Sequence, residues 1–304
     1  MIELLRKTNI DFMGKRPFTF SLSGILILLG IIAIVQIWRG AANLGIDFAG
    51  GTAVQVKFEK SVQLQDIRVT LEQGGIRDFD LQDLPAENKV LIRIKKGGTA
   101  VGELADKVIS ILSQRFSANK PLIDSTTEIG PKVGSRLRND ALIAIGVATI
   151  GILIYIAFRF QFRFAVGATI ATFHDVLAVL GIFYILGKEI NLILVSALLT
   201  IAGYSLTDTV VVFDRIRENM RKGFKENTET TVNRSINEVL SRTIIVSLTT
   251  LITAAALFFF GGEVIHDFSL AMILGIIVGT YSSVFVASPV VLMWKSKKPL
   301  AKKP

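Results

Sequence analysis

The chain has 304 residues, 51% of them hydrophobic, a formal net charge of +9 and a mean hydropathy of +0.54, which soluble domains of this size rarely reach. The absence of cysteine excludes disulfides, thiolate metal sites and thiol catalysis. The positive charge would suit nucleic-acid binding, but most of the cations lie beside long apolar runs, so we expect no nucleic-acid partner.

Six apolar runs are long enough to cross a bilayer, which takes about 20 residues in a helix. The first covers 18–38, and its length and the lack of a small-residue cleavage site favour a retained anchor over a signal peptide. The other five form a predicted bundle over 141–294, with spans at 141–158, 164–186, 190–213, 243–261 and 267–294. The sequence therefore predicts an α-helical polytopic membrane protein with six transmembrane helices.

Lysine and arginine gather on one side of these spans. They are frequent in the N-terminal segment 1–17, at the connection between the second and third spans, in the segment 214–242 and in the tail 295–304. The loops on the opposite side are poor in cations. By the positive-inside rule, both termini and the segment 214–242 are predicted to be cytoplasmic. Apolar residues at helical spacing predict that part of 214–242 is an amphipathic helix leading into the fifth span.

Residues 39–138, between the first and second spans, are predicted to form one small exterior domain. Alternating patterns predict strands at 52–58, 76–83, 89–94 and 121–129, and helical spacing predicts helices at 63–73 and 99–116. The last strand is expected to place Ile123, Thr127 and Ile129 on one face. The order βαββαβ is that of an α+β ferredoxin-like domain.

A glycine-rich stretch, "LGIDFAGGTAVQVKF", leads into the first of these strands. Gly50 and Gly51 permit positive φ and a sharp entry into the domain, with Asp47 just before them. A phosphate-binding loop is the alternative interpretation, but no Lys-Ser/Thr follows. We therefore favour a structural role for Asp47, Gly50 and Gly51.

Ionisable residues inside the spans are the main candidates for function, because such residues are rare and costly in lipid. Asp208 lies in the fourth span, His174 and Asp175 lie near the middle of the third, and Arg242 begins the fifth. Asp208 could instead be a structural clamp, His174 and Asp175 a self-satisfied pair, and Arg242 a snorkelling anchor. Burial disfavours an ionised carboxylate and a nearby cation favours it, so Asp208 and Arg242 are predicted to act as a proton relay.

Pairs of glycines in the spans predict closely packed helices: Gly146 and Gly151, Gly181 and Gly187, and Gly275 and Gly279. The sequence shows no paired-carboxylate, Ser-His-Asp or metal-spaced cluster. We therefore expect neither an enzyme nor a metal site.

Four motifs together resemble the SecF family of bacterial protein-export membrane proteins, part of the SecD/SecF family of the RND superfamily. They are "GIDFAGG" at 45–51, "IGPKVGSRL" at 129–137, "FHDVLAVLG" at 173–181 and "GYSLTDTVVVFDRIREN" at 203–219. The last motif is the most specific. The resemblance covers about 20–294, and the layout of six spans with one exterior domain also fits.

This resemblance implies a function that composition and spacing do not show. It implies an inner-membrane subunit that works with SecD, the SecYEG channel and YajC. Such a subunit uses the proton-motive force, and no cofactor, to draw exported polypeptides across after the ATPase SecA has started them. It also implies that Asp208 is the proton-responsive acid and Arg242 its partner; the role of His174 and Asp175 stays open.

Two other functions are compatible with the same membrane fold. A proton-driven exporter of small molecules or lipids would be expected to have larger exterior domains, including a second one between later spans, where this chain has only short loops. A non-transporting scaffold of a membrane complex is the other, and it predicts that Asp208 tolerates replacement by asparagine.

Overall fold

A computed structural model describes residues 8–84, 88–95, 103–222 and 226–293; the predicted tail at 295–304 lies outside them. The chain divides into two compact units. One comprises residues 1–43 and 145–304 and contains most of the long helices, and the other comprises 44–144 and contains the sheet.

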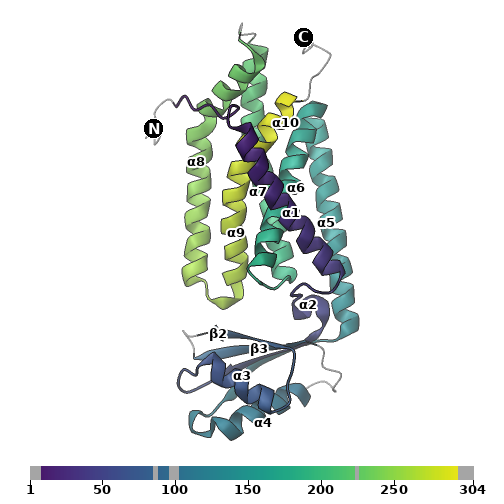
Figure 1. Ribbon diagram of the computed structural model, residues 1–304, viewed down its shortest axis with the longest axis vertical. Helices are drawn as coiled ribbons and strands as arrows, with labels where there is room; N and C mark the ends of the chain where they lie inside the picture. Colours follow the sequence, from purple (N-terminus) through teal and green to yellow (C-terminus); the bar gives the residue numbers. More distant parts are fainter. Residues whose placement is uncertain (1–7, 85–87, 96–102, 223–225, 294–304) are drawn as a thin grey trace. The chain divides into compact units, whose positions relative to one another are not determined.

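Six apolar helices of the described residues are long enough to span a membrane, as predicted (Figure 1). The last span, Ile265–Met293, is composite: helix α9 continues through a π-helical stretch, η3, into α10. The elements of the six spans are α1 (Arg16–Trp38), α5 (Pro131–Arg159), α6 (Phe162–Ile185), α7 (Leu192–Arg221), α8 (Thr228–Phe260), α9 (Glu263–Ser282), η3 (Ser283–Ala287) and α10 (Ser288–Met293).

Three of these helices extend well beyond the apolar runs that predicted them. Helix α5 begins at Pro131, ten residues before the predicted start, because proline is favoured at the first helical position and the polar residues after it continue the helix. Helix α7 continues to Arg221, and α8 begins at Thr228, where Asn227 caps it by accepting a 2.7 Å hydrogen bond from the Thr230 N–H. The segment 214–242 therefore consists mainly of two helical extensions, and its amphipathic part is the start of α8.

Helix α6 is the centre of the membrane unit, where it packs against α1, α7 and α9. It crosses α1 at two glycines: a Cβ at Gly30 would lie 2.4 Å from the Leu177 carbonyl oxygen, and one at Gly181 would lie 2.6 Å from the Gly30 nitrogen. No side chain fits between these backbones, so the close approach predicted at Gly181 is confirmed.

The same prediction is wrong for three other glycines. A Cβ at Gly146, Gly151 or Gly187 would meet no atom within 4 Å. Gly187 has φ +65° and lies in the turn that follows α6, which is a conformational role. Gly146 and Gly151 lie on α5, which is the least buried of the six spans. Near the end of α5, Ile156 is buried.

The segment before α1 is anchored on the start of α8. Phe12 and Met13 are buried, and their backbone N–H groups both donate to Asn233 Oδ1 at 3.0 Å. Asp11 accepts from the Gly14 N–H and from Asn233, and these bonds hold the pKa of Asp11 below its usual value. Arg16 pairs with Glu229 at 2.6 Å. The N-terminal segment and the start of α8 therefore lie on the same side of the helices.

The second unit has the predicted ferredoxin-like arrangement. Four antiparallel strands stand in the order β2-β3-β1-β4, and two helices complete the order βαββαβ. The elements are β1 (Gly51–Lys57), α3 (Leu64–Gln73), β2 (Phe79–Leu84), β3 (Lys89–Lys95), α4 (Glu103–Arg115) and β4 (Leu122–Ile129). Apolar side chains of the sheet and both helices form its core, including Val54, Val56, Ile67, Leu71, Val90, Ile92, Val108 and Leu112.

Strand β4 differs from the prediction on one point. Its register against β1 shifts, since Gln55 pairs with Ser125 but Val56 pairs with Ile123, which leaves an extra residue at Asp124. Such a bulge reverses the alternation of side chains. Ile123 therefore lies on the opposite face of the sheet from Thr127 and Ile129, and the predicted common face is wrong.

Candidate functional site

Asp208 lies on α7 in the membrane unit, where it is half-buried. Its Oδ2 accepts a hydrogen bond of 2.5 Å from the Ser283 hydroxyl, at the start of the π-helical stretch η3. A carboxylate inside an apolar span needs such donors, because an unpaired charge is costly there. Asp208 is therefore bonded to the last span, at η3, in addition to lying beside residues of α8.

Asp208 and Arg242 line the same pocket, between α7 and α8. The pocket has a volume of about 80 Å³, and the Tyr204 and Thr243 side chains also line it. Among the described residues no ion pair joins the Asp208 carboxylate to the Arg242 guanidinium, and Arg242 is largely exposed. The structure thus places the two predicted partners on one cavity without direct contact.

This pocket is suited to water. The Tyr204 hydroxyl is buried without a hydrogen-bond partner among the described residues, and Thr243 Oγ1 is buried on the side of the pocket next to Asp208. A polar site needs roughly 10–15 Å³ for one water molecule and two to four polar partners to hold it. The pocket offers that volume together with two hydroxyls and a carboxylate, so a water molecule would fit there with polar partners.

Asp175 lies deeper, with none of its surface exposed. Its Oδ1 is 2.9 Å from His174 Nδ1, and its Oδ2 accepts hydrogen bonds from the hydroxyls of Ser205 on α7 and Ser282 on α9, the latter at 2.8 Å. A buried carboxylate with three donors is well satisfied. Asp175 therefore also ties α6 to α7 and α9, as a structural clamp would.

One ring nitrogen of His174, Nε2, takes no part in this hydrogen-bond network. The residue is 1% exposed, and its Nε2 has no partner among the described residues. Its ring lies beside Tyr281, with 6.2 Å between the ring centroids. The Tyr281 hydroxyl in turn donates to the Thr19 carbonyl oxygen of α1 at 2.7 Å. The pair His174–Asp175 thus contacts α7 and α9, and Tyr281 connects this group to α1.

The structure brings all four intramembrane candidates into one region and adds residues that the sequence analysis missed. Ser282 and Ser283 are consecutive, and each bonds to a different carboxylate. The signal in the sequence was a polar tract, Thr280–Ser283, inside the last apolar run. Single hydroxyls are common in membrane helices, so only their placement reveals the role.

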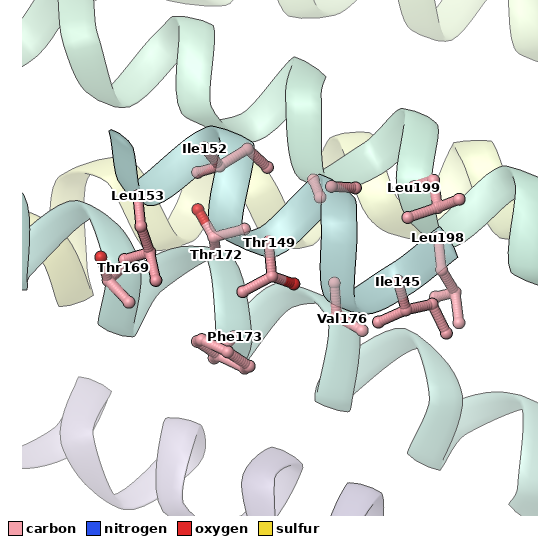
Figure 2. A pocket seen from close by; sticks show the side chains of 12 residues that line it. Ile145, Thr149, Ile152, Leu153, Thr169, Thr172, Phe173, Val176, Leu198 and Leu199 are labelled. Carbon is pink, nitrogen blue, oxygen red and sulfur yellow. The ribbon is translucent and has the colours of Figure 1, made fainter. Parts of the chain in front are cut away.

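A second pocket, between α5, α6 and α7, has no such chemistry (Figure 2). Its volume is about 70 Å³, and no ionisable side chain lines it. Figure 2 shows aliphatic side chains and Phe173 around it, with three threonines. The hydroxyls of Thr169 and Thr172 donate to carbonyl oxygens of their own helix, at 2.9 and 3.0 Å. This second pocket therefore offers no ionisable group that could bind a proton.

The glycine-rich entry stretch lies in the other unit. Asp47 falls in a four-residue helix, α2 (Ile46–Ala49), and Gly50 and Gly51 follow with φ of +75° and +148°. A Cβ at Gly51 would lie 2.3 Å from the Ile94 carbonyl oxygen. Both backbone conformations and the close contact require glycine here.

In the described residues no group of three His, Asp or Glu side chains could hold a metal.

The packing of α7 on α9 depends on Gly275. A Cβ there would lie 2.4 Å from the Ile201 side chain, and one at Gly279 would lie 3.1 Å from the Ser205 Cβ. We expect Gly275→Val to destabilise the fold by about 1–3 kcal/mol, the usual cost of overpacking. Thermal unfolding of the purified chain in mild detergent measures this. Gly146→Val, where no atom lies within 4 Å, is the matched control, and equal midpoints for both variants would contradict the packing.

Comparison with known families finds two matches in this chain. Residues 109–297 match the family described as Protein export membrane protein SecD/SecF, C-terminal. Residues 42–62 match the SecD/SecF GG Motif, which contains Asp47, Gly50 and Gly51.

Curated relatives match over almost their whole length. The Protein translocase subunit SecF of Thermodesulfovibrio yellowstonii is 62% identical over 295 residues, which covers 96% of this chain and 97% of the relative. The subunit of the same name from Calditerrivibrio nitroreducens is 44% identical over 299 residues, 97% of each chain.

Solved structures show the same fold. The crystal structure of SecDF, a translocon-associated membrane protein from Thermus thermophilus, superposes with a TM-score of 0.81 at 36% identity. That match covers 94% of this chain but only 39% of the solved one, which is therefore much longer. A crystal structure of SecDF in a super-membrane-facing form gives a TM-score of 0.69 at the same identity.

Proposed function

Because the chain belongs to the SecD/SecF family of protein-export membrane proteins, we propose that it is a SecF-type subunit of a protein translocase. The observation that carries this proposal is the 62% identity, over nearly the full length of both chains, to a protein named for that role. The chain is a multi-pass membrane protein, and its action is on the transport of polypeptides rather than on a covalent bond.

We propose SecD as its direct partner. The solved SecDF chain contains a region similar to this chain and a larger remainder, since this chain covers 39% of it. The SecYEG channel, YajC and an exported polypeptide complete the proposed assembly, with SecA acting earlier in transport. The exposed apolar side chains of α5 and α8 leave surface for helices of a partner and for lipid.

The energy source that we propose is the proton gradient, without a cofactor. Asp208 binds a proton from the pocket that it shares with Arg242, and the exposed arginine side chain is long enough to change its distance from the carboxylate. Protonation removes a charge from the space between α7, α8 and η3. The packing of these helices then differs between the two charge states, and that difference can drive movement of the exterior domain.

The test of this function is release of a secreted polypeptide from membrane vesicles. Vesicles that contain the channel, SecD and this chain are loaded with a translocation intermediate, ATP is removed, and a proton gradient is imposed. We expect release to require both the gradient and this chain. Gradient-dependent release that is equally fast without the chain would contradict the proposal, and export of a small molecule instead would favour the exporter.

The proposed orientation, in the inner membrane with both termini in the cytoplasm, predicts the result of reporter fusions. Fusions after Lys188 and Gly262, in the two loops that are poor in cations, should report an exterior position. Fusions after Lys222, beside the many cations between α7 and α8, should report a cytoplasmic one. A cytoplasmic signal at Gly262 would overturn this topology.

A further inference from the structure

Two consecutive serines connect Asp175, which is fully buried, with Asp208, which is half-buried. Ser282 donates to Asp175 Oδ2 on α6, at 2.8 Å, and Ser283 donates to Asp208 Oδ2 on α7, at 2.5 Å. Successive side chains of an α-helix point about 100° apart, because there are about 3.6 residues in a turn. A single dipeptide can therefore face both neighbouring helices, and no other pair of adjacent residues in the described chain bonds to both carboxylates.

Each of these hydroxyls also has a second acceptor within reach. Ser282 Oγ lies 3.1 Å from the Gly279 carbonyl oxygen, and Ser283 Oγ lies 3.1 Å from that of Thr280. A hydroxyl has one proton to donate, so each serine must choose between the carboxylate and the backbone. An ionised carboxylate is the stronger acceptor. A protonated one can donate to the serine oxygen instead, and the hydroxyl proton then turns to the carbonyl.

The helix is irregular at the same place. The π-helical stretch η3 begins at Ser283, and the Ser288 hydroxyl donates to the Ser283 carbonyl oxygen at 2.9 Å, five residues apart. Short π-helical stretches interrupt the regular hydrogen bonding of a helix and often lie at functional sites. A change in the bonding of Ser283 therefore acts at the point where the regular hydrogen bonding of the helix is interrupted.

The Asp175 side of this connection can take up a proton of its own. His174 Nδ1 bonds to Asp175 Oδ1, while the buried Nε2 has no partner among the described residues. A neutral imidazole that donates from Nδ1 has a free acceptor at Nε2, which can bind one more proton. The pair His174–Asp175 thus has a proton capacity that the proposed relay at Asp208 and Arg242 does not use.

We propose that Ser282 and Ser283 are positioning residues that couple protonation of Asp208 to protonation of the pair His174–Asp175. The inference rests on the proposed proton use and adds a second proton-binding position to it. The proton bound at Asp208 stays on that carboxyl group. The change that passes to Asp175 is the rearrangement of two hydroxyl hydrogen bonds on one helix segment.

Direct electrostatic interaction between the two carboxylates is the alternative, and the other nearby groups do not bridge them. The titratable group that bonds to Asp175 is His174, and the ring of Tyr281 lies beside His174. The titratable groups facing Asp208 are Tyr204 and Arg242, which line its pocket. Charge interaction acts through space and does not need the serine hydroxyls, so removing the hydroxyls separates the two explanations.

Infrared difference spectroscopy of the full chain in lipid bilayers provides the test, because it detects protonated carboxyl groups directly. The band that Asp208→Asn removes is followed as a function of pH, with and without Asp175→Asn. With both serines present, we expect Asp175→Asn to shift the midpoint of the Asp208 band by about one pH unit, the size of interaction at which two titrating groups behave as a coupled pair. With Ser282→Ala and Ser283→Ala, we expect less than half of that shift.

Ser269→Ala is the matched control, since Ser269 is a buried serine of the same helix that bonds to the Ile265 carbonyl oxygen. It should leave the shift unchanged. Should the double alanine variant not fold, Ser283→Ala alone carries the comparison, because Asp175 then keeps all its partners. A shift that is equally large without the hydroxyls would overturn the proposal.

The result is independent of protein export. A serine-dependent shift combined with normal release by Asp208→Asn vesicles would remove the proposed proton use and leave the coupling. A serine-independent shift combined with loss of release would remove the coupling and leave the proposed proton use.

Discussion

Asp208→Asn is expected to reduce gradient-driven release of a secreted polypeptide to the rate measured without a gradient. Asparagine has nearly the same shape and still accepts the hydrogen bond from Ser283, so the fold and the assembly with SecD should survive. It cannot bind and release a proton, and therefore α7 keeps one charge state. The assay is release from vesicles after removal of ATP, with equal amounts of each variant confirmed by immunoblot.

Asp214→Asn is the control for this experiment. Asp214 is an acid of the same helix, about one and two-thirds turns further on, and pairs with Arg159 at 2.6 Å near the surface. Exposed ion pairs contribute about 0–1 kcal/mol, so this variant should fold and release polypeptide normally. If Asp208→Asn vesicles released polypeptide at the wild-type rate, Asp208 would be a structural clamp and the scaffold function would be favoured.

Arg242→Ala is expected to stall the same step, although no ion pair joins it to Asp208 in the described structure. Both side chains line one pocket of about 80 Å³, and a cation there favours the ionised form of the carboxylate. Without the cation, Asp208 should release its proton less readily. Release should therefore fall towards the rate without a gradient, while Arg242→Lys, which keeps the charge, should retain part of the activity.

The double variant shows whether the two residues act together. If Asp208 and Arg242 serve one step, Asp208→Asn with Arg242→Ala should be no slower than the slower single variant, since effects on a shared step are not additive. Arg234→Ala is the control: it removes the same residue type from α8, where Arg234 pairs with Glu226 at 2.8 Å. Normal release by Arg242→Ala would leave Arg242 as a snorkelling anchor.

The ionisable residues of the membrane spans show how far residue type alone identifies candidate sites. Asp208, Arg242, His174 and Asp175 were identifiable because an ionisable residue in an apolar run is costly whatever surrounds it. Their partners were not identifiable, because a serine costs little in a membrane helix and occurs there for many reasons. Ser282 meets Asp175 across 107 positions of the sequence, and no local pattern predicts that contact.

The glycines show the same limit. Gly146 and Gly275 both lie in apolar helices at similar spacing from a second glycine, and both were predicted to allow close packing. Of these two glycines, only Gly275 is covered by another helix: a Cβ there would meet the Ile201 side chain, whereas a Cβ at Gly146 would meet no atom within 4 Å. Spacing along a helix tells which residues share a face, but not whether another helix covers that face.

The sequence by itself determined the six membrane spans and the ferredoxin-like order of the unit formed by residues 44–144. Both follow from periodic or continuous patterns of apolar residues, which act over one element at a time and set which surface must be buried. The ends of α5, α7 and α8 were misjudged, because hydropathy detects the apolar part of a helix and not its polar extensions.

Only the tertiary structure decided the bulge in β4, the crossing of α1 and α6 at Gly30 and Gly181, and the serine pair between Asp175 and Asp208. Each of these depends on the distance between backbones or side chains that are far apart in the sequence. Such distances are set by the packing of whole helices and strands, in which every contact constrains the others.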